Sequence, residues 1–217
     1  MLVQKGGGLR IAGAALVFTA SSVAAQSAAS ADPDNDTNES QAGVGPQAGP
    51  NLHTYCFGNA VGATFENWVH DTNNVTSANS DFSDGFSSYC DRSGSIQTDV
   101  EWLVGSAMGS RGLTDCVAPS PQNGDCDRAI VIVDQLVIAQ NSPDHYINNV
   151  RKTICHENGH TMGLTHYKNN GFTLDDADPE HRGGTQHNDC MASGGVNDDG
   201  IWRVFNHHHK AHINDNF

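Results

Sequence analysis

The sequence of 217 residues has few basic side chains, with 11 Lys and Arg against 25 Asp and Glu. Two of the basic residues, Lys5 and Arg10, lie in the first 25 residues, so the rest of the chain has nine basic and 25 acidic side chains, a formal charge of −16. This acidity argues against nucleic acid or an anionic membrane as a partner. The sequence also lacks an apolar run of about 20 residues, the length that a membrane-spanning helix needs.

The N-terminal region is typical of export. Residues 1–25 predict a signal peptide, with a positively charged start, a short apolar stretch and the small-residue cleavage site Val23-Ala24-Ala25. A retained amphipathic anchor is the alternative. Residues 26–50 are rich in Ala, Ser, Asp, Asn, Gly and Pro, which predicts a disordered linker or a short pro-segment. Residues 51–217 have the length of one domain. Because of the predicted signal peptide and the lack of a membrane-spanning stretch, we expect a secreted, extracellular, soluble protein.

Coarse patterns predict the elements of this domain. Residues 51–95 are rich in Asn, Ser and Thr with scattered aromatic residues, and we expect short strands and loops there. Alternation over 98–104 predicts a strand, and the β-branched run 129–133 predicts a central strand that 136–139 continues. Residues 202–214 predict a final helix.

A helix of about 20 residues is predicted to begin at Ser142-Pro143-Asp144. This tripeptide combines a capping serine, a proline at the first helical position and an acid in the first turn. Val150 and Ile154 then recur at helical spacing. The most informative stretch of the chain follows near the end of this helix, and it reads His156-Glu157-Asn158-Gly159-His160-Thr161-Met162-Gly163-Leu164-Thr165-His166.

This stretch predicts a zinc site. On a helix, His156 and His160 lie one turn apart on one face, with Cβ atoms about 5–6 Å apart, so both imidazoles can bind one ion. Gly163 can adopt a positive φ and end the helix, which lets His166 supply a third ligand and leaves a fourth position for water. Glu157 points off that face, where it can take a proton from the zinc-activated water. A polar helix with solvent-exposed histidines is the alternative.

The motif resembles the long zinc signature of the metzincin metalloproteases. Metzincins also have a methionine turn beneath the metal, and Met191, 25 residues after His166 and followed by glycines, matches it. An ordinary core methionine is the alternative. The Cys-His-Glu-x-x-His and Asp-Cys-Met segments are similar to those of small secreted actinobacterial-type members. Tyr167, directly after the third histidine, matches no well-known subfamily, and Ser193, two residues after the methionine, replaces the additional tyrosine ligand of astacins.

The resemblance implies an α+β, metzincin-like catalytic domain. Its twisted mixed sheet has about five strands, an active-site helix and a C-terminal helix, and an antiparallel edge strand binds an extended substrate by strand addition. We therefore expect a monomeric, secreted zinc endopeptidase that hydrolyses protein or peptide substrates, with one catalytic Zn²⁺ and Glu157 as general base. A non-catalytic zinc-stabilised binding module of the same fold is the alternative, and a zinc hydrolase acting on another substrate class is a third reading.

An even number of cysteines in an exported chain predicts three disulfides. Cys116 and Cys126 bracket a short loop of Pro, Asn and Gly and are expected to pair locally. If the methionine turn lies under the zinc helix, Cys155 and Cys190 come close and pair, because they directly precede His156 and Met191. Such pairing leaves the two cysteines nearest the N-terminus, which are Cys56 and Cys90. The rival hypothesis is that Cys155 or Cys190 binds the metal.

The acidic loops and the histidine run 207–209 are further candidates for metal binding. The acidic loops could hold Ca²⁺, but neither has an EF-hand spacing, and solvated loops are the favoured interpretation. Their acidic residues are Asp175, Asp176, Asp178, Asp198 and Asp199. Residues 207–209 are three consecutive histidines, which point in different directions on a helix and cannot all bind one ion.

Overall fold

A computed structural model describes most of the predicted domain. The described residues are 52–59, 61–93, 98–119, 126–164, 190–191, 195–196, 203–205, 209–210 and 213–214. The predicted signal peptide and the segment 26–50 lie outside them. No helix among the described residues is long and apolar enough to cross a membrane.

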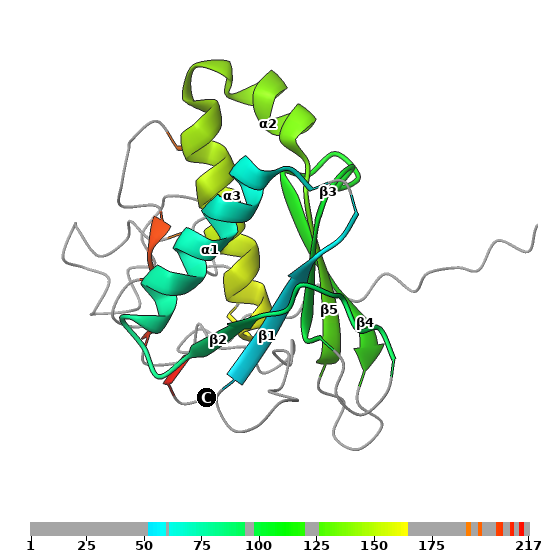
Figure 1. Ribbon diagram of the computed structural model, residues 1–217. Helices are drawn as coiled ribbons and strands as arrows, with labels where there is room; N and C mark the ends of the chain where they lie inside the picture. Colours follow the sequence, from blue (N-terminus) through cyan, green and yellow to red (C-terminus); the bar gives the residue numbers. More distant parts are fainter. Residues whose placement is uncertain are drawn as a thin grey trace, which may run out of the picture.

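One five-stranded sheet organises the domain (Figure 1). Its strands are β1 (Leu52–Phe57), β2 (Ser83–Phe86), β3 (Val100–Val104), β4 (Gly112–Pro119) and β5 (Cys126–Val133), in the order β2-β1-β3-β5-β4. The pairs β1–β2, β1–β3 and β3–β5 are parallel, whereas β4 runs antiparallel to β5 at the edge. The predicted mixed sheet of an α+β domain is therefore confirmed, and β5 has a neighbour on each side, as its β-branched run predicted.

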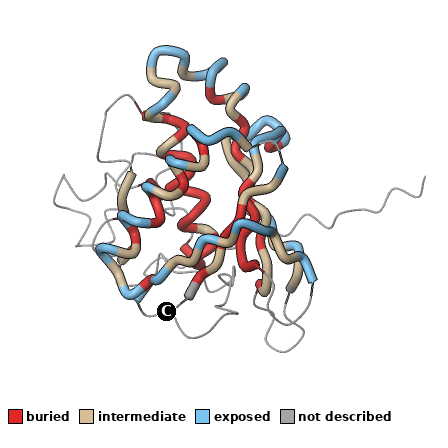
Figure 2. Tube along the Cα trace, in the orientation of Figure 1, coloured by how far each residue is buried: buried red, intermediate tan, exposed pale blue. Residues whose placement is uncertain are grey.

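Helices cover one face of this sheet (Figure 1). They are α1 (Ala63–Ser77), α2 (Gln135–Asn141) and α3 (Tyr146–Thr161), and a 3₁₀ turn at Pro143–His145 precedes α3. Alternate strand residues share one face, and Val100 and Trp102 on β3 are fully buried in one core cluster with Val150 and Ile154 of α3. Each such side chain contributes about 1.5–3 kcal/mol on burial. Figure 2 shows that α3 is buried along most of its length, which fixes the geometry of any site built on it.

The prediction of strands and loops over 51–95 is wrong for the middle of that range. Residues 63–77 form α1, and its buried face holds Phe65, Val69, Thr72 and Thr76, spaced three or four residues apart. The Asn and Thr side chains have low intrinsic helix propensity. Burial of this one face against the core outweighs that propensity, because tertiary packing supplies most helix stability in proteins.

The segment after β5 also differs from the prediction. Residues 136–139 belong to α2 and do not continue the strand, because the Asp134 carboxylate accepts hydrogen bonds from the backbone N–H groups of Leu136 and Val137 and caps a helix. The Ser142 side chain makes no capping hydrogen bond, and its Oγ accepts one from Arg111 instead. Of the predicted helix 202–214, positions 209–210 and 213–214 are α-helical, whereas the other described positions, 203–205, are not.

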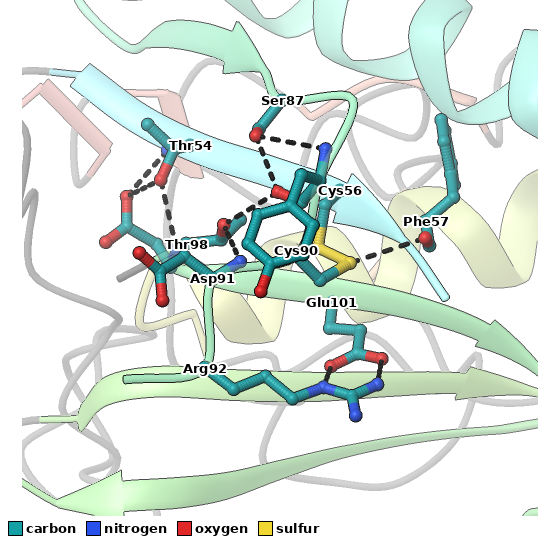
Figure 3. The surroundings of a disulfide bond; sticks show 11 residues. Thr54, Cys56, Phe57, Ser87, Cys90, Asp91, Arg92, Thr98 and Glu101 are labelled. Carbon is teal, nitrogen blue, oxygen red and sulfur yellow. Dashed lines mark hydrogen bonds and ion pairs between the residues drawn. A yellow bond between two sulfur atoms is a disulfide. The ribbon is translucent and has the colours of Figure 1, made fainter. Parts of the chain in front are cut away.

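All three predicted disulfides are present: Cys56–Cys90, Cys116–Cys126 and Cys155–Cys190. Figure 3 shows the first of them, which joins β1 to the segment after β2. Beside it, Asp99 accepts hydrogen bonds from the backbone N–H and the hydroxyl group of Thr54. The hypothesis that Cys155 or Cys190 is a metal ligand is wrong, because both sulfur atoms are used in a disulfide.

Candidate active site

The end of α3 is shaped by Gly163. Its φ is +89°, as predicted for a residue that ends the helix, and an L side chain would be strained there. This turn lets the backbone N–H of Leu164 donate to the Gly159 carbonyl at 2.9 Å. It also brings the Leu164 carbonyl oxygen to 2.8 Å from Nδ1 of His160. The helix terminus therefore orients the second histidine of the motif.

The first histidine is oriented by a different segment of the chain. Nδ1 of His156 lies 2.7 Å from the backbone carbonyl oxygen of Cys190. The disulfide from Cys155, the residue before His156, holds Cys190 in place. This disulfide, predicted from the positions of the two cysteines, joins the two backbone segments. It thereby also fixes the Cys190 carbonyl oxygen that orients the imidazole ring of His156.

These contacts determine which ring nitrogens face each other. A carbonyl oxygen can only accept, so Nδ1 donates in both rings and Nε2 of each neutral ring carries a lone pair. The two Nε2 atoms of His156 and His160 are 3.2 Å apart. Burial of the His160 ring lowers its pKa from 6.5 to about 4. The ring is therefore neutral at pH 7, although the residue as a whole is only partly buried.

This geometry fits a zinc ion. Two nitrogen ligands of one tetrahedral Zn²⁺, each at about 2.0–2.1 Å, are about 3.3–3.4 Å apart. The observed 3.2 Å separation of the Nε2 atoms is close to that value. Zinc-binding histidines also commonly donate their other N–H to a carbonyl or carboxylate, as His156 and His160 do.

A third ligand is not placed by the described residues. Among them, no group of three or more His, Cys, Asp or Glu side chains is arranged to hold a metal ion. His166, the predicted third ligand, lies outside the described residues, as do the aspartates considered for Ca²⁺. Of the three consecutive histidines, His209 alone is described, and it is fully buried.

Glu157 lies next to His156 but faces the edge strand β4. Its side chain is 5% exposed, and Oε2 accepts a hydrogen bond from the hydroxyl group of Thr114 at 2.8 Å. Burial raises the pKa of Glu157 from 4.5 to about 7, against the smaller opposing effects of the Thr114 hydroxyl group and of Lys152. A carboxyl group of this kind exchanges a proton readily near neutral pH.

Met191 lies against the same helix. It is fully buried in a cluster with Cys155, Met162 and Phe205. A Cβ atom added to Gly159 would clash with its sulfur atom, so the methionine packs directly on the α3 backbone between the two histidines. This position is consistent with the packing role predicted for Met191.

Sequence reasoning missed Gly112 and Thr114 of β4, which contact Glu157. Residues 112–119 were not predicted to form a strand, and no spacing links them to the zinc motif 43 residues away. The partner carbonyl of Cys190 was missed as well, because a backbone acceptor has no sequence signature. His53, which belongs to no sequence motif, is fully buried beside the Phe82 ring.

Comparisons with known proteins identify no relative of this chain. The sequence matches no protein-family model, and a search of curated proteins finds none that is significantly similar.

Proposed function

We propose that the protein is a secreted zinc-dependent endopeptidase of metzincin type. The observation that carries the proposal is the pair of Nε2 atoms of His156 and His160, 3.2 Å apart, with the buried carboxyl group of Glu157 on the adjacent helix position. In this proposal His156, His160 and His166 hold the zinc, and Met191 packs beneath the first two. When bound, zinc supplies the Lewis acidity that polarises a carbonyl group and makes water nucleophilic near neutral pH.

Glu157 provides the acid–base chemistry. Its carboxylate takes a proton from the attacking water, and its carboxyl group then returns that proton to the leaving amine. A pKa near 7 suits both roles, because the group must gain and lose a proton in each turnover. A purely structural zinc site has no use for such a residue, and burial of the carboxyl group, which raises its pKa, costs stability when the group is charged. This cost favours catalysis over a binding module.

The edge strand suggests how a peptide binds. Among the described residues, β4 pairs with β5 alone, and β4 contacts α3 at Glu157. An extended peptide can add to the other edge of β4 through backbone hydrogen bonds. Cleavage within a chain, not at its ends, follows from such binding. The three disulfides support the proposed extracellular location, since such bonds persist in oxidising compartments.

Hydrolysis of protein substrates tests the proposal. The purified protein should cleave casein and internally quenched peptides, lose this activity with 1,10-phenanthroline, and regain it when zinc is added. The same protein is tested on ester and N-acylated sugar substrates. Hydrolysis of one of these without hydrolysis of peptides would identify a zinc hydrolase of another class. Stoichiometric zinc binding without hydrolysis of any substrate would support the zinc-stabilised binding module and contradict the endopeptidase.

A further inference from the structure

The carboxyl group of Glu157 is held by two residues of β4 that point the same way. Gly112 and Thr114 are two positions apart on this strand and therefore share one face. The Thr114 hydroxyl group donates to Oε2 of Glu157 at 2.8 Å and lies 3.2 Å from the Glu157 backbone oxygen. A Cβ atom on Gly112 would lie 2.7 Å from both Cγ and Cδ of Glu157, which is closer than real contacts allow.

The two carboxyl oxygens consequently differ. Oε2 is engaged by Thr114, whereas no hydrogen bond within the described part of the chain reaches Oε1. Oε1 occupies the space that the missing side chain of Gly112 leaves. A glutamate has three rotatable side-chain bonds, and without these contacts its carboxyl group would sample several positions.

We propose that Thr114 is a positioning residue for the proposed peptidase reaction, that it holds Oε2 of Glu157 so that Oε1 accepts the proton, and that Gly112 provides the space for this arrangement. The inference rests on the proposed function. A reacting group must lie within hydrogen-bond reach of the proton it takes, so a small displacement of the carboxyl group lowers kcat without weakening the binding of the peptide.

Two substitutions at Thr114 separate positioning from packing. Thr114→Val keeps the shape of the side chain and removes the hydroxyl group, whereas Thr114→Ser keeps the hydroxyl group and removes the methyl group. If the hydrogen bond is what matters, Thr114→Val should lower kcat about 10- to 100-fold with KM within about twofold, and Thr114→Ser should stay within about threefold of wild type. Zinc affinity, measured by competition with a chromophoric chelator, should not change in either variant.

Gly112→Ala tests the same arrangement independently, should Thr114→Val fold poorly. The added methyl group should displace the carboxyl group and lower kcat about as strongly. Thr153→Val is the matched control, because it removes a buried hydroxyl group on α3 that bonds to the Asn149 carbonyl group and not to Glu157. It should leave kcat unchanged.

The outcomes are distinguishable. An active wild type with Thr114→Val and Gly112→Ala at wild-type kcat would overturn the positioning role and leave the proposed function intact. Equal losses in Thr114→Val and Thr114→Ser would reduce the role of Thr114 to packing and also overturn it. A wild type without chelator-sensitive hydrolysis would overturn the proposed function, and this inference with it.

Discussion

Two buried glutamates in this domain lie in opposite electrostatic surroundings. Glu101 on β3 is 2% exposed, and the guanidinium group of Arg92 donates to both of its oxygens, at 2.9 and 2.5 Å (Figure 3). Glu157 on α3 is 5% exposed and has a hydroxyl group as its hydrogen-bond donor. The first charge is neutralised within the fold, whereas burial raises the pKa of the second to about 7. Burial of a carboxyl group thus does not by itself mark a site; the difference lies in the hydrogen-bond donor, which is a guanidinium group for Glu101 and, among the described residues, a hydroxyl group for Glu157.

Replacing each glutamate in turn by glutamine should show the contrast between them most clearly in catalysis. Glu157→Gln keeps the shape and the Thr114 contact but removes the base, so kcat/KM should fall about 10²- to 10⁴-fold while zinc content stays at the wild-type level. Glu101→Gln should keep wild-type kcat/KM per folded molecule. Initial rates on a quenched peptide, normalised to bound zinc, measure both. An active Glu157→Gln enzyme would remove Glu157 from the mechanism.

The second largest effect is expected in the pH dependence of the free energy of unfolding of the metal-free protein. Because the folded-state pKa of Glu157 lies above its ordinary value of 4.5, folding holds the proton more tightly. The stability from this group is complete below pH 4.5 and is lost as the pH rises through about 7. Glu157→Gln should therefore raise the free energy of unfolding at pH 8 by on the order of 3 kcal/mol, and by much less at pH 4.5. Urea denaturation at the two pH values measures the difference, and an unchanged value at pH 8 would contradict it.

His53, a buried histidine away from the candidate site, should have a smaller effect on the pH dependence of stability. Burial lowers the pKa of His53 from 6.5 to about 3, so the neutral ring supports folding above pH 6.5 and stability is lost as the pH falls below that value. Its contribution changes by at most about 1.4 kcal/mol per pH unit. His53→Gln should flatten the fall in stability between pH 6.5 and pH 5. Phe82→Leu, which removes the neighbouring ring but keeps the histidine, should lower stability while keeping the wild-type slope.

Local sequence signals predicted much of this fold because they act over a few residues. The β-branched run of β5, the alternation of β3 and the spacing of Val150 and Ile154 each report a single buried face. α1 escaped prediction because its buried face includes Thr72, Asn73 and Thr76, polar residues that no hydrophobic pattern detects. α2 escaped because a single side-chain cap at Asp134 turned an apolar run into a helix.

The candidate site divides in the same way. Residues on α3 and its terminus followed from helical spacing, so the facing of His156 and His160 and the positive φ of Gly163 were predicted. The partners that orient these groups come from distant segments and depend on tertiary structure. The Cys190 carbonyl group and the Thr114 hydroxyl group are 34 and 43 residues from their partners, and the register of β4 against α3 has no local code.

Zinc-edge X-ray absorption of the purified protein, combined with its zinc content, tests the central claim most directly. The account predicts one zinc per chain with imidazole nitrogens at about 2.0–2.1 Å, and loss of that zinc in His156→Ala and in His160→Ala but not in His70→Ala. A protein that binds no zinc, or that binds it without imidazole ligands and keeps it in the His156 and His160 variants, would contradict the account.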